Sequence, residues 1–489
     1  MSQVGSSLKG ALMIAEIKNR ETREIRMRKV GRCLVWIFSF IAVVAFLVIS
    51  GRAQSSASDE AVVLKDVRVI DGLGGPPLEQ SVILIKGDRI VAIGTIEKVS
   101  WPKSARVIDY GGKTVVPGLI SDHSHVGQVD GAGTAPQNYN RANILRQLQQ
   151  YEVYGVTTVV ALGLNGDLFY ELRPQLHAGA LPGADLLGAD RGIGIPNGAP
   201  PIFNLPESRL YRVSTPEEAM KAVDEMVARK PDLIKIWIDD FRGSLRVKMP
   251  PEVYAAAIKE AHKLGLRVAA HIYYLADAKS LVNSGVDIIA HGVRDRPVDA
   301  EFVSLMKSHS AWYISTIDLD ESFYIYAEKP EWLKNQFLLH ALQPALLAQF
   351  NDPDWRAKTL GNQKQIEDSK ASVLMNERNL KALYDAGVNI GFGTDSGANA
   401  LRIPGFAEHR ELELMVDAGL TPLEAISLAT AKAAALLHLD DRGVLAPGKL
   451  ADMIVVDGNP AAQIKGIHNI EAVWHRGKLV GGRVQDFTP

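Results

Sequence analysis

The sequence predicts an α/β fold, in which a (β/α)₈ TIM barrel carries a small β-sandwich domain formed from both chain ends. Eight apolar, strand-like runs alternate with amphipathic helical stretches in the middle of the chain. Short alternating apolar runs, separated by glycine, come before that region and return after it. The 489 residues, of which 47% are hydrophobic and 22% charged, exclude a disordered or cysteine-stapled protein and leave room for one barrel and one smaller module.

Residues 1–58 are expected to form a basic leader with a hydrophobic signal or anchor segment. Nine Lys and Arg residues against three Glu make residues 1–53 basic. Residues 33–50 run for 18 residues without a charge, close to the ~20 that a helix needs to cross a bilayer. Two interpretations remain open: a retained membrane anchor, or a secretory signal cleaved after the small residues Gly51 and Ala53. The protein is therefore expected to be exported, periplasmic or extracellular after cleavage, or anchored by residues 33–50, with no other membrane contact.

Two stretches are predicted to build the β-sandwich domain, residues 59–117 near one end and residues 439–489 at the other. The first contains VVLKDVRVIDGLG, SVILIKGDRIVAIG and ARVIDYGGKTVVPG, and the second contains LADMIVVDGNP and IEAVWHRGKLVGGRV. Alternating apolar residues bounded by glycine are typical of short strands joined by turns. Because a layer of such strands needs a second layer to bury its apolar face, the two ends are predicted to pair.

Residues 118–438 are predicted to form the barrel. The strand candidates, in order, are GLISDHSH, VTTVVALG, DLLGADRGIG, DLIKIWI, RVAAHIY, DIIAHG, AWYIST and VNIGFGTDS. A barrel of this kind places its functional site at the C-terminal ends of the strands. Some 70 residues rich in Tyr, Phe and Trp separate the last two strands, and they are expected to form a lid or substrate wall.

Polar residues fall at the predicted strand ends. His123 and His125 are two residues apart at the end of the first strand, so both imidazoles point to the same side. Lys235 lies inside the apolar strand DLIKIWI, where an unpartnered ammonium is costly, so it is expected to be neutral or modified, or to reach a buried carboxylate. The remaining candidates close strands five, six and eight: His271, His291 and Asp395. Imidazole and carboxylate are ligands of Zn²⁺, Mn²⁺ and Fe²⁺, so these residues predict a metal site.

Taken together, these motifs resemble the amidohydrolase superfamily, particularly its imidazolonepropionase-like and prolidase-like branch. The resemblance covers residues 61–484: VIDG and GDRIVAIG, the strand VVPGLISDHSH, then DLIKIWI, RVAAHIYYLADAKSLVNSGVDIIAHG and GFGTDSG, and the closing GKLADMIVVDGNP. It implies two divalent metal ions, expected to be zinc, held by six side chains: His123, His125, Lys235, His271, His291 and Asp395.

The resemblance also implies a role for each of these side chains. The two histidines of the first strand would bind one ion, and those of strands five and six would bind the second. Lys235, as a carbamate formed with CO₂, would bridge the two ions, and Asp395 would bind the first ion and act as general acid and base. The expected reaction is hydrolysis of a C–N bond in an N-acyl amino acid, dipeptide or small cyclic amide by a metal-activated hydroxide.

Other functions are considered beside this one. The same hydroxide would serve an esterase, a lactonase or a phosphotriesterase, and this alternative stays open. A non-enzymatic scaffold would be expected to have lost ligands, whereas all six positions carry competent residues. The expected partner is a small-molecule substrate. The net charge of -2 offers no basic field for nucleic acid, and assembly into a homo-oligomer is left open.

Two further residues are candidates for substrate binding. Arg294, three residues after His291, is expected to bind a substrate carboxylate through its planar guanidinium or to pair with Asp295. Tyr273 follows His271 and is expected to reach the cavity or to serve packing. Where members of the family often have Pro-Thr-Leu at a strand end, residues 315–320 read STIDLD, so we expect a different substrate wall.

Overall fold

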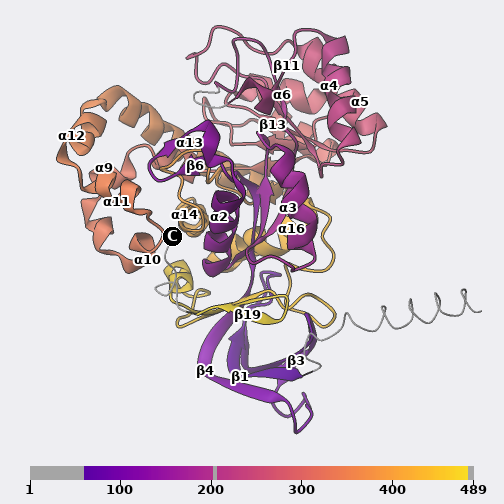
Figure 1. Ribbon diagram of the computed structural model, residues 1–489, viewed down its shortest axis with the longest axis vertical. Coiled ribbons are helices and arrows are strands. Elements are labelled where there is room, and N and C mark those ends of the chain that lie inside the picture. Colours follow the sequence, from indigo (N-terminus) through magenta and orange to yellow (C-terminus); the bar gives the residue numbers. More distant parts are fainter. Residues whose placement is uncertain (1–59, 202–205, 483–489) are drawn as a thin grey trace, which may run out of the picture. The chain divides into compact units, whose positions relative to one another are not determined.

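The computed structural model describes residues 60–201 and 206–482 of the chain, which are mixed α/β (Figure 1). The leader predicted over residues 1–58, with its apolar run at residues 33–50, lies outside these residues. Within the described ranges, the helices are all too short or too polar to span a bilayer.

Strands from both sides of the described chain form one seven-stranded sheet, in the order β19-β18-β17-β4-β1-β2-β3. The strands are β1 (Ala61–Val69), β2 (Leu78–Lys86), β3 (Arg89–Thr95), β4 (Arg106–Pro117), β17 (Met453–Val456), β18 (Ile470–His475) and β19 (Lys478–Gly481). β17 runs antiparallel to β4, with Met453 opposite Pro117, and β1 runs parallel to β4. The two ends are therefore joined edge to edge through β4 and β17.

A common apolar core explains why these segments pair. The strands are rich in Val and Ile, which fit a pleated and half-buried surface. Val67, Ile83 and Val115 from the N-terminal strands pack in one buried cluster with Val455 and Trp474 from the C-terminal strands. Neither group of strands completes this cluster alone, so each end depends on the other for its core.

Eight parallel strands run through the middle of the chain. One sheet holds β5 (Leu119–Ser124), β8 (Val156–Ala161) and β9 (Asp185–Gly188). A second sheet holds the other five in chain order, β12 (Ile234–Trp237), β13 (Val268–His271), β14 (Ile288–Ala290), β15 (Trp312–Ile314) and β16 (Asn389–Gly391), with the short β10 (Ile193–Gly194) and β11 (Tyr211–Arg212) at its edge. Parallel bridges from Ala189 to Leu233 and from Ser124 to Ser396 join the two sheets, so the first strand of the series neighbours the last.

Helices connect these strands and cover them. They are α2 (Arg141–Val153), α3 (Asp167–His177), α4 (Pro216–Ala228), α5 (Pro251–Lys263), α6 (Leu275–Asn283), α7 (Ala300–Ser308), α14 (Phe406–Asp417), α15 (Pro422–Ser427) and α16 (Ala433–Leu436). Local sequence sets several of their starts. The Thr215 side chain caps α4 by accepting from the Glu218 amide, and Thr421 and Glu424 form a reciprocal capping box at α15.

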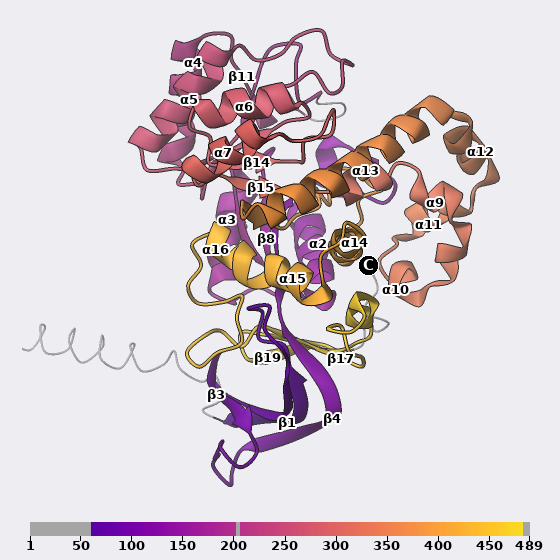
Figure 2. The ribbon, with the colours of Figure 1, turned by 180° about the vertical axis from the view of Figure 1, so that it is seen from behind.

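The long connection between β15 and β16 is helical. It contains α8 (Asp318–Glu321), α9 (Ile325–Glu328), α10 (Gln336–Leu339), α11 (Pro344–Asn351), α12 (Pro353–Gly361) and α13 (Gln363–Asp385). Figure 2 shows α9, α11 and α12 together, with the long α13 leading back toward the strands. Residues of α8 and α13, including Leu319, Asp320 and Ser369, line a cavity at the strand ends, so the connection supplies a wall of that cavity.

Candidate metal centre

The C-terminal ends of the parallel strands bring the predicted site residues together. His123 lies within β5, and Lys235 within β12, while His271 is the last residue of β13. His291 follows β14 with φ 81°, and Asp395 follows β16 with φ 61°. Positive φ in a residue other than glycine is strained and is concentrated at functional sites. The Asp395 amide also donates to the His123 carbonyl at 2.9 Å, which fixes the last strand's loop against the first strand.

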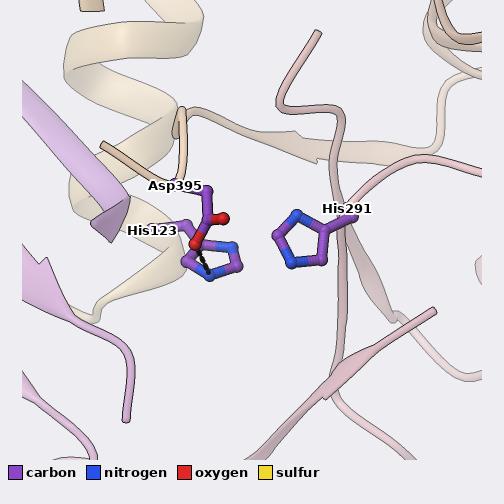
Figure 3. A group of neighbouring side chains, drawn as sticks. All are labelled: His123, His291 and Asp395. Atoms are coloured by element: carbon purple, nitrogen blue, oxygen red, sulfur yellow. Dashed lines mark ion pairs between the residues drawn. The ribbon is translucent and has the colours of Figure 1, made fainter. Parts of the chain in front are cut away.

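Four imidazoles and one carboxylate meet in this region. Asp395 Oδ1 lies 3.0 Å from His125 Nε2 and 3.3 Å from His123 Nε2. The His291 ring centroid is 4.5 Å from that of His123 and 4.4 Å from that of His271. One ligand atom from each of His123, His291 and Asp395 lies within 4.8 Å of the others. Figure 3 shows these three side chains. This spacing is suited to a metal ion.

Lys235 is completely buried, and its ammonium nitrogen has no hydrogen-bond partner among the described residues. It lies 5.3 Å from the centroid of the Trp237 ring. Burial lowers the pKa of Lys235 to about 7, against the opposing effect of Asp395 and Asp239. A large neutral fraction of this amine therefore exists near neutral pH, and the neutral amine is the form that adds to CO₂.

Burial also sets the protonation of the other groups. It lowers the pKa of His123 to about 3, and it lowers the pKa of His271 and His291 as well. Burial alone would raise the pKa of Asp395, but Arg402 and the contacts from the neighbouring histidines lower it well below its usual range. Neutral imidazoles and an ionised carboxylate are the forms that bind metal ions.

The donor atoms left over in the site fit divalent ions. Buried polar atoms are normally hydrogen-bonded, yet several here have no partner within the described part of the chain. They share one neighbourhood: Nδ1 of His123, His125 and His271, Oδ2 of Asp239 and Nζ of Lys235. Nitrogen and carboxylate donors without sulfur suit Zn²⁺ or Mn²⁺.

Sequence reasoning missed two charged residues of this centre. Asp239 is fully buried, with Oδ1 3.3 Å from His271 Nε2. The sequence pattern could have indicated its position, because Lys235, Trp237 and Asp239 follow the two-residue period of a strand and so share one face. Arg402 donates from Nη1 to Asp395 Oδ2, but it lies in an irregular loop whose sequence carries no such period.

A buried network supports the turn that carries Asp395. Glu408, on α14, is completely buried and accepts hydrogen bonds from the hydroxyls of Ser121 at 3.1 Å, Thr394 at 2.7 Å and Ser396 at 2.6 Å. It also accepts from the Gly405 amide at 2.9 Å. Thr394 and Ser396 flank Asp395, so one carboxylate fixes both sides of the strained residue.

A cavity of about 860 Å³ opens onto the centre and contains most of the predicted site residues. His125, His271, His291 and Asp395 line it. Its size suits a small organic substrate.

Arg294 and Tyr273 also line this cavity. Arg294 is buried and donates to the carbonyls of Gly292 at 3.1 Å and Ile272 at 3.0 Å and to Asp320 Oδ2 at 3.1 Å. Its ion-pair partner is therefore Asp320 and not Asp295. Three of its donors are already used, and its role in substrate binding stays a prediction.

The fold and the site together define a metal-dependent hydrolase. The chain belongs to the Amidohydrolase family, whose model matches residues 114–480. The superfamily resemblance drawn from the motifs is thus confirmed.

Individual relatives agree with this assignment. A putative prolidase from Bifidobacterium longum has 27% identity and a TM-score of 0.69, covering 86% of this chain and 94% of the other. A Xaa-Pro dipeptidase with bound methionine has 25% identity and a TM-score of 0.68, covering 86% and 99%. Imidazolonepropionase from Deinococcus radiodurans is 24% identical over 405 residues, covering 78% of this chain and 86% of the relative. The protein is accordingly a hydrolase that acts on carbon–nitrogen bonds.

Proposed function

We propose that the protein is a binuclear amidohydrolase that cleaves the amide of an N-acyl amino acid, a dipeptide or a small cyclic amide. The observation that carries the proposal is the meeting of four buried imidazoles, Asp395 and an unpartnered Lys235 at the ends of parallel strands. The similarity to proteins described as a prolidase and a Xaa-Pro dipeptidase supports the substrate class.

We assign the fold accordingly. The eight parallel strands and their two connecting bridges support a closed (β/α)₈ barrel over residues 118–438. The shared seven-stranded sheet supports one composite domain built from residues 59–117 and 439–489, and its arrangement as a β-sandwich stays a proposal.

The ligands divide into two groups. His123 and His125 would hold one zinc ion, and His271 and His291 the other. Lys235, carboxylated by CO₂, would supply an oxygen ligand to both, and Asp395 would complete the first group. When bound, the ions would lower the pKa of a water molecule and polarise the substrate carbonyl.

The chain's own residues then handle the proton. Asp395 is ionised, so it can accept a proton from the attacking water and deliver it to the leaving nitrogen. Its hydrogen bond from Arg402 holds Oδ2, while Oδ1 faces His123 and His125. Arg402 therefore orients the carboxylate and keeps it charged. Trp237 and Phe241 form part of the cavity wall.

The alternative electrophiles are esters, lactones and phosphotriesters, since the same site would attack them. The leader supports export or anchoring through residues 33–50, and N-terminal sequencing of the cell-derived protein would distinguish the two. We propose a small-molecule substrate and no nucleic-acid partner, and gel filtration would reveal a homo-oligomer.

The decisive experiment combines metal analysis with a substrate panel. The purified protein should contain about two divalent ions per chain, lose activity on chelation and regain it with Zn²⁺ or Mn²⁺ plus bicarbonate. The panel holds N-acylprolines, lactones and aryl phosphotriesters. Activity on phosphotriesters alone, or a protein that binds no metal even after reconstitution, would overturn the proposal.

A further inference from the structure

Two arginines from different loops meet one buried aspartate on the cavity wall. Arg242 follows β12, Arg294 follows β14, and both donate to Asp320 on α8. Their guanidinium carbons each lie 5.0 Å from the centroid of the Tyr273 ring. All four residues line the cavity that opens onto the candidate metal centre.

The two guanidinium groups differ in what they can still bind. Arg294 has 3% of its side chain exposed, and its Nε, Nη1 and Nη2 all donate to protein acceptors. Arg242 has 29% of its side chain exposed. Within the described residues its one hydrogen bond is made by Nη2 to Asp320, which leaves Nε and Nη1 for a ligand.

Charged groups of both signs meet on this wall. Asp320 lies between the two guanidinium groups and supplies one negative charge. Asp239 contacts the neutral His271 at 3.3 Å, and Asp368 pairs with Lys364 at 2.8 Å. In the described structure neither of these two carboxylates accepts a hydrogen bond from Arg242, so its two remaining donor groups can bind an anionic group of a ligand.

The backbone of the loop presents Arg242 to the cavity in an unusual conformation. Phe241 and Arg242 have φ of 49° and 60°, so two successive residues other than glycine adopt the left-handed region. Such strain persists where the surrounding structure enforces it, and often at ligand-binding sites. The same turn stacks the Phe241 ring on His271, with centroids 4.6 Å apart and planes 9° apart.

Apolar side chains lie on the cavity wall together with Arg242. They are Leu164, Trp237, Phe241 and Phe323. A ligand that fits both features carries an anionic group and a bulky apolar group. A carboxylate matches the guanidinium well, because its two oxygens can accept from two donors of the planar fork.

We infer that Arg242 binds the free carboxylate of the substrate, whose apolar side chain contacts the aromatic wall. This inference rests on the proposed function and narrows it to N-acyl amino acids and dipeptides with an apolar C-terminal residue. Arg294 then serves as a positioning residue, which holds Asp320 so that Asp320 can hold Arg242.

The experiment compares Arg242→Gln with Arg246→Gln in the metal-loaded enzyme. Arg246 is an exposed arginine of the same loop that does not line the cavity, so its loss removes an equal charge. The substrates are N-acetyl-phenylalanine and its carboxamide, which share the scissile acetyl amide. We expect Arg242→Gln to raise KM about 10- to 100-fold for the acid and to change it little for the carboxamide, because one charged hydrogen-bond pair is lost. Arg246→Gln should alter neither.

A binding measurement separates this inference from the proposed function. Calorimetric titration of 3-phenylpropionate and 3-phenylpropionamide requires no turnover. The wild-type enzyme should prefer the acid, and Arg242→Gln should abolish that preference, with partial retention in Arg242→Lys. An acid preference that survives in Arg242→Gln would overturn the inference, as would an equal loss for acid and amide. If the preference depends on Arg242 but neither acetyl amide is hydrolysed, the carboxylate site stands and the proposed substrate class fails.

Discussion

Replacement of Lys235 by methionine tests the unpartnered buried amine directly. Methionine keeps a linear apolar stem beside Trp237 and removes the ionisable nitrogen. An ordinary core substitution destabilises a protein. Here the metal-free variant should instead be more stable than the metal-free wild type, because the wild type buries an amine with no hydrogen-bond partner in the described structure.

The size of the effect follows from the pKa. The folded protein holds the Lys235 pKa at about 7, against an ordinary value of 10.5. Between these values the unfolded chain binds a proton that the folded chain does not, so wild-type stability rises with pH over this window. Below about pH 7 Lys235 is protonated in both the folded and the unfolded state, and its burial lowers the free energy of unfolding by about 5 kcal/mol. This loss of stability falls to about 3 kcal/mol at pH 8 and to about 1 kcal/mol at pH 10.

The assay is urea denaturation of chelator-treated protein at pH 8 and at pH 10. Lys235→Met should raise the free energy of unfolding by about 3 kcal/mol at pH 8 and by about 1 kcal/mol at pH 10. Lys221→Met is the control, since that side chain is 79% exposed and should change stability little at either pH. A variant that is less stable at pH 8, or whose difference is the same at both pH values, would refute the reasoning. The reconstituted variant should also bind less metal and lose at least about 100-fold in kcat/KM.

Three further outcomes follow from the site. Asp395→Asn should lower kcat about 10²- to 10⁴-fold with little change in KM for an N-acyl amino acid, because the amide side chain cannot accept the proton. A metal-loaded Asp395→Asn variant with wild-type kcat would show that Asp395 is not the general acid and base. Glu408→Gln should lower the free energy of unfolding in urea by about 1–3 kcal/mol, because the new amide nitrogen cannot accept a hydrogen bond from the donors around it. The kcat should also fall, because the turn that carries Asp395 becomes less rigid. An unchanged free energy of unfolding would contradict the role of the buried network. Gly163→Ala should lower the free energy of unfolding by about 1–3 kcal/mol more than Gly265→Ala does. Both glycines have positive φ, but only at Gly163 would a new Cβ approach Trp237, at 2.5 Å; equal losses in thermal unfolding would show that backbone strain alone matters.

The site residues at the strand ends could be predicted from the sequence, because metal-binding residue types occur at the positions where the strands were expected to end. His271 and His291 each follow a short buried run, and such a residue must lie at the edge where parallel strands finish. The two-residue period predicted a common face for His123 and His125, and both approach the same oxygen of Asp395. Family membership, read from these motifs, was confirmed.

The charges that surround the centre could not be predicted in the same way. Arg402 reaches Asp395 from an irregular loop, and no periodic pattern relates the two residues. Arg242 depends on positive φ at a residue whose side chain gives no sign of it. Arg294 was the candidate for substrate binding that the sequence indicated, because it follows His291. In the structure, however, its Nε, Nη1 and Nη2 donate hydrogen bonds to Asp320 and to two carbonyls. Pairings of this kind depend on how loops from separate strands meet.

The pairing of β4 with β17 has a consequence for how the chain is made. Pro117 leaves the ribosome more than 300 residues before Met453, the residue that it faces in the finished sheet. During that interval the edge of β4 presents free amide and carbonyl groups, which invite pairing with other chains. Contacts between such distant segments also form late and slowly. A molecular chaperone that shields this edge until synthesis ends would therefore raise the yield of folded enzyme, and a truncated chain would keep the edge open and be prone to aggregate.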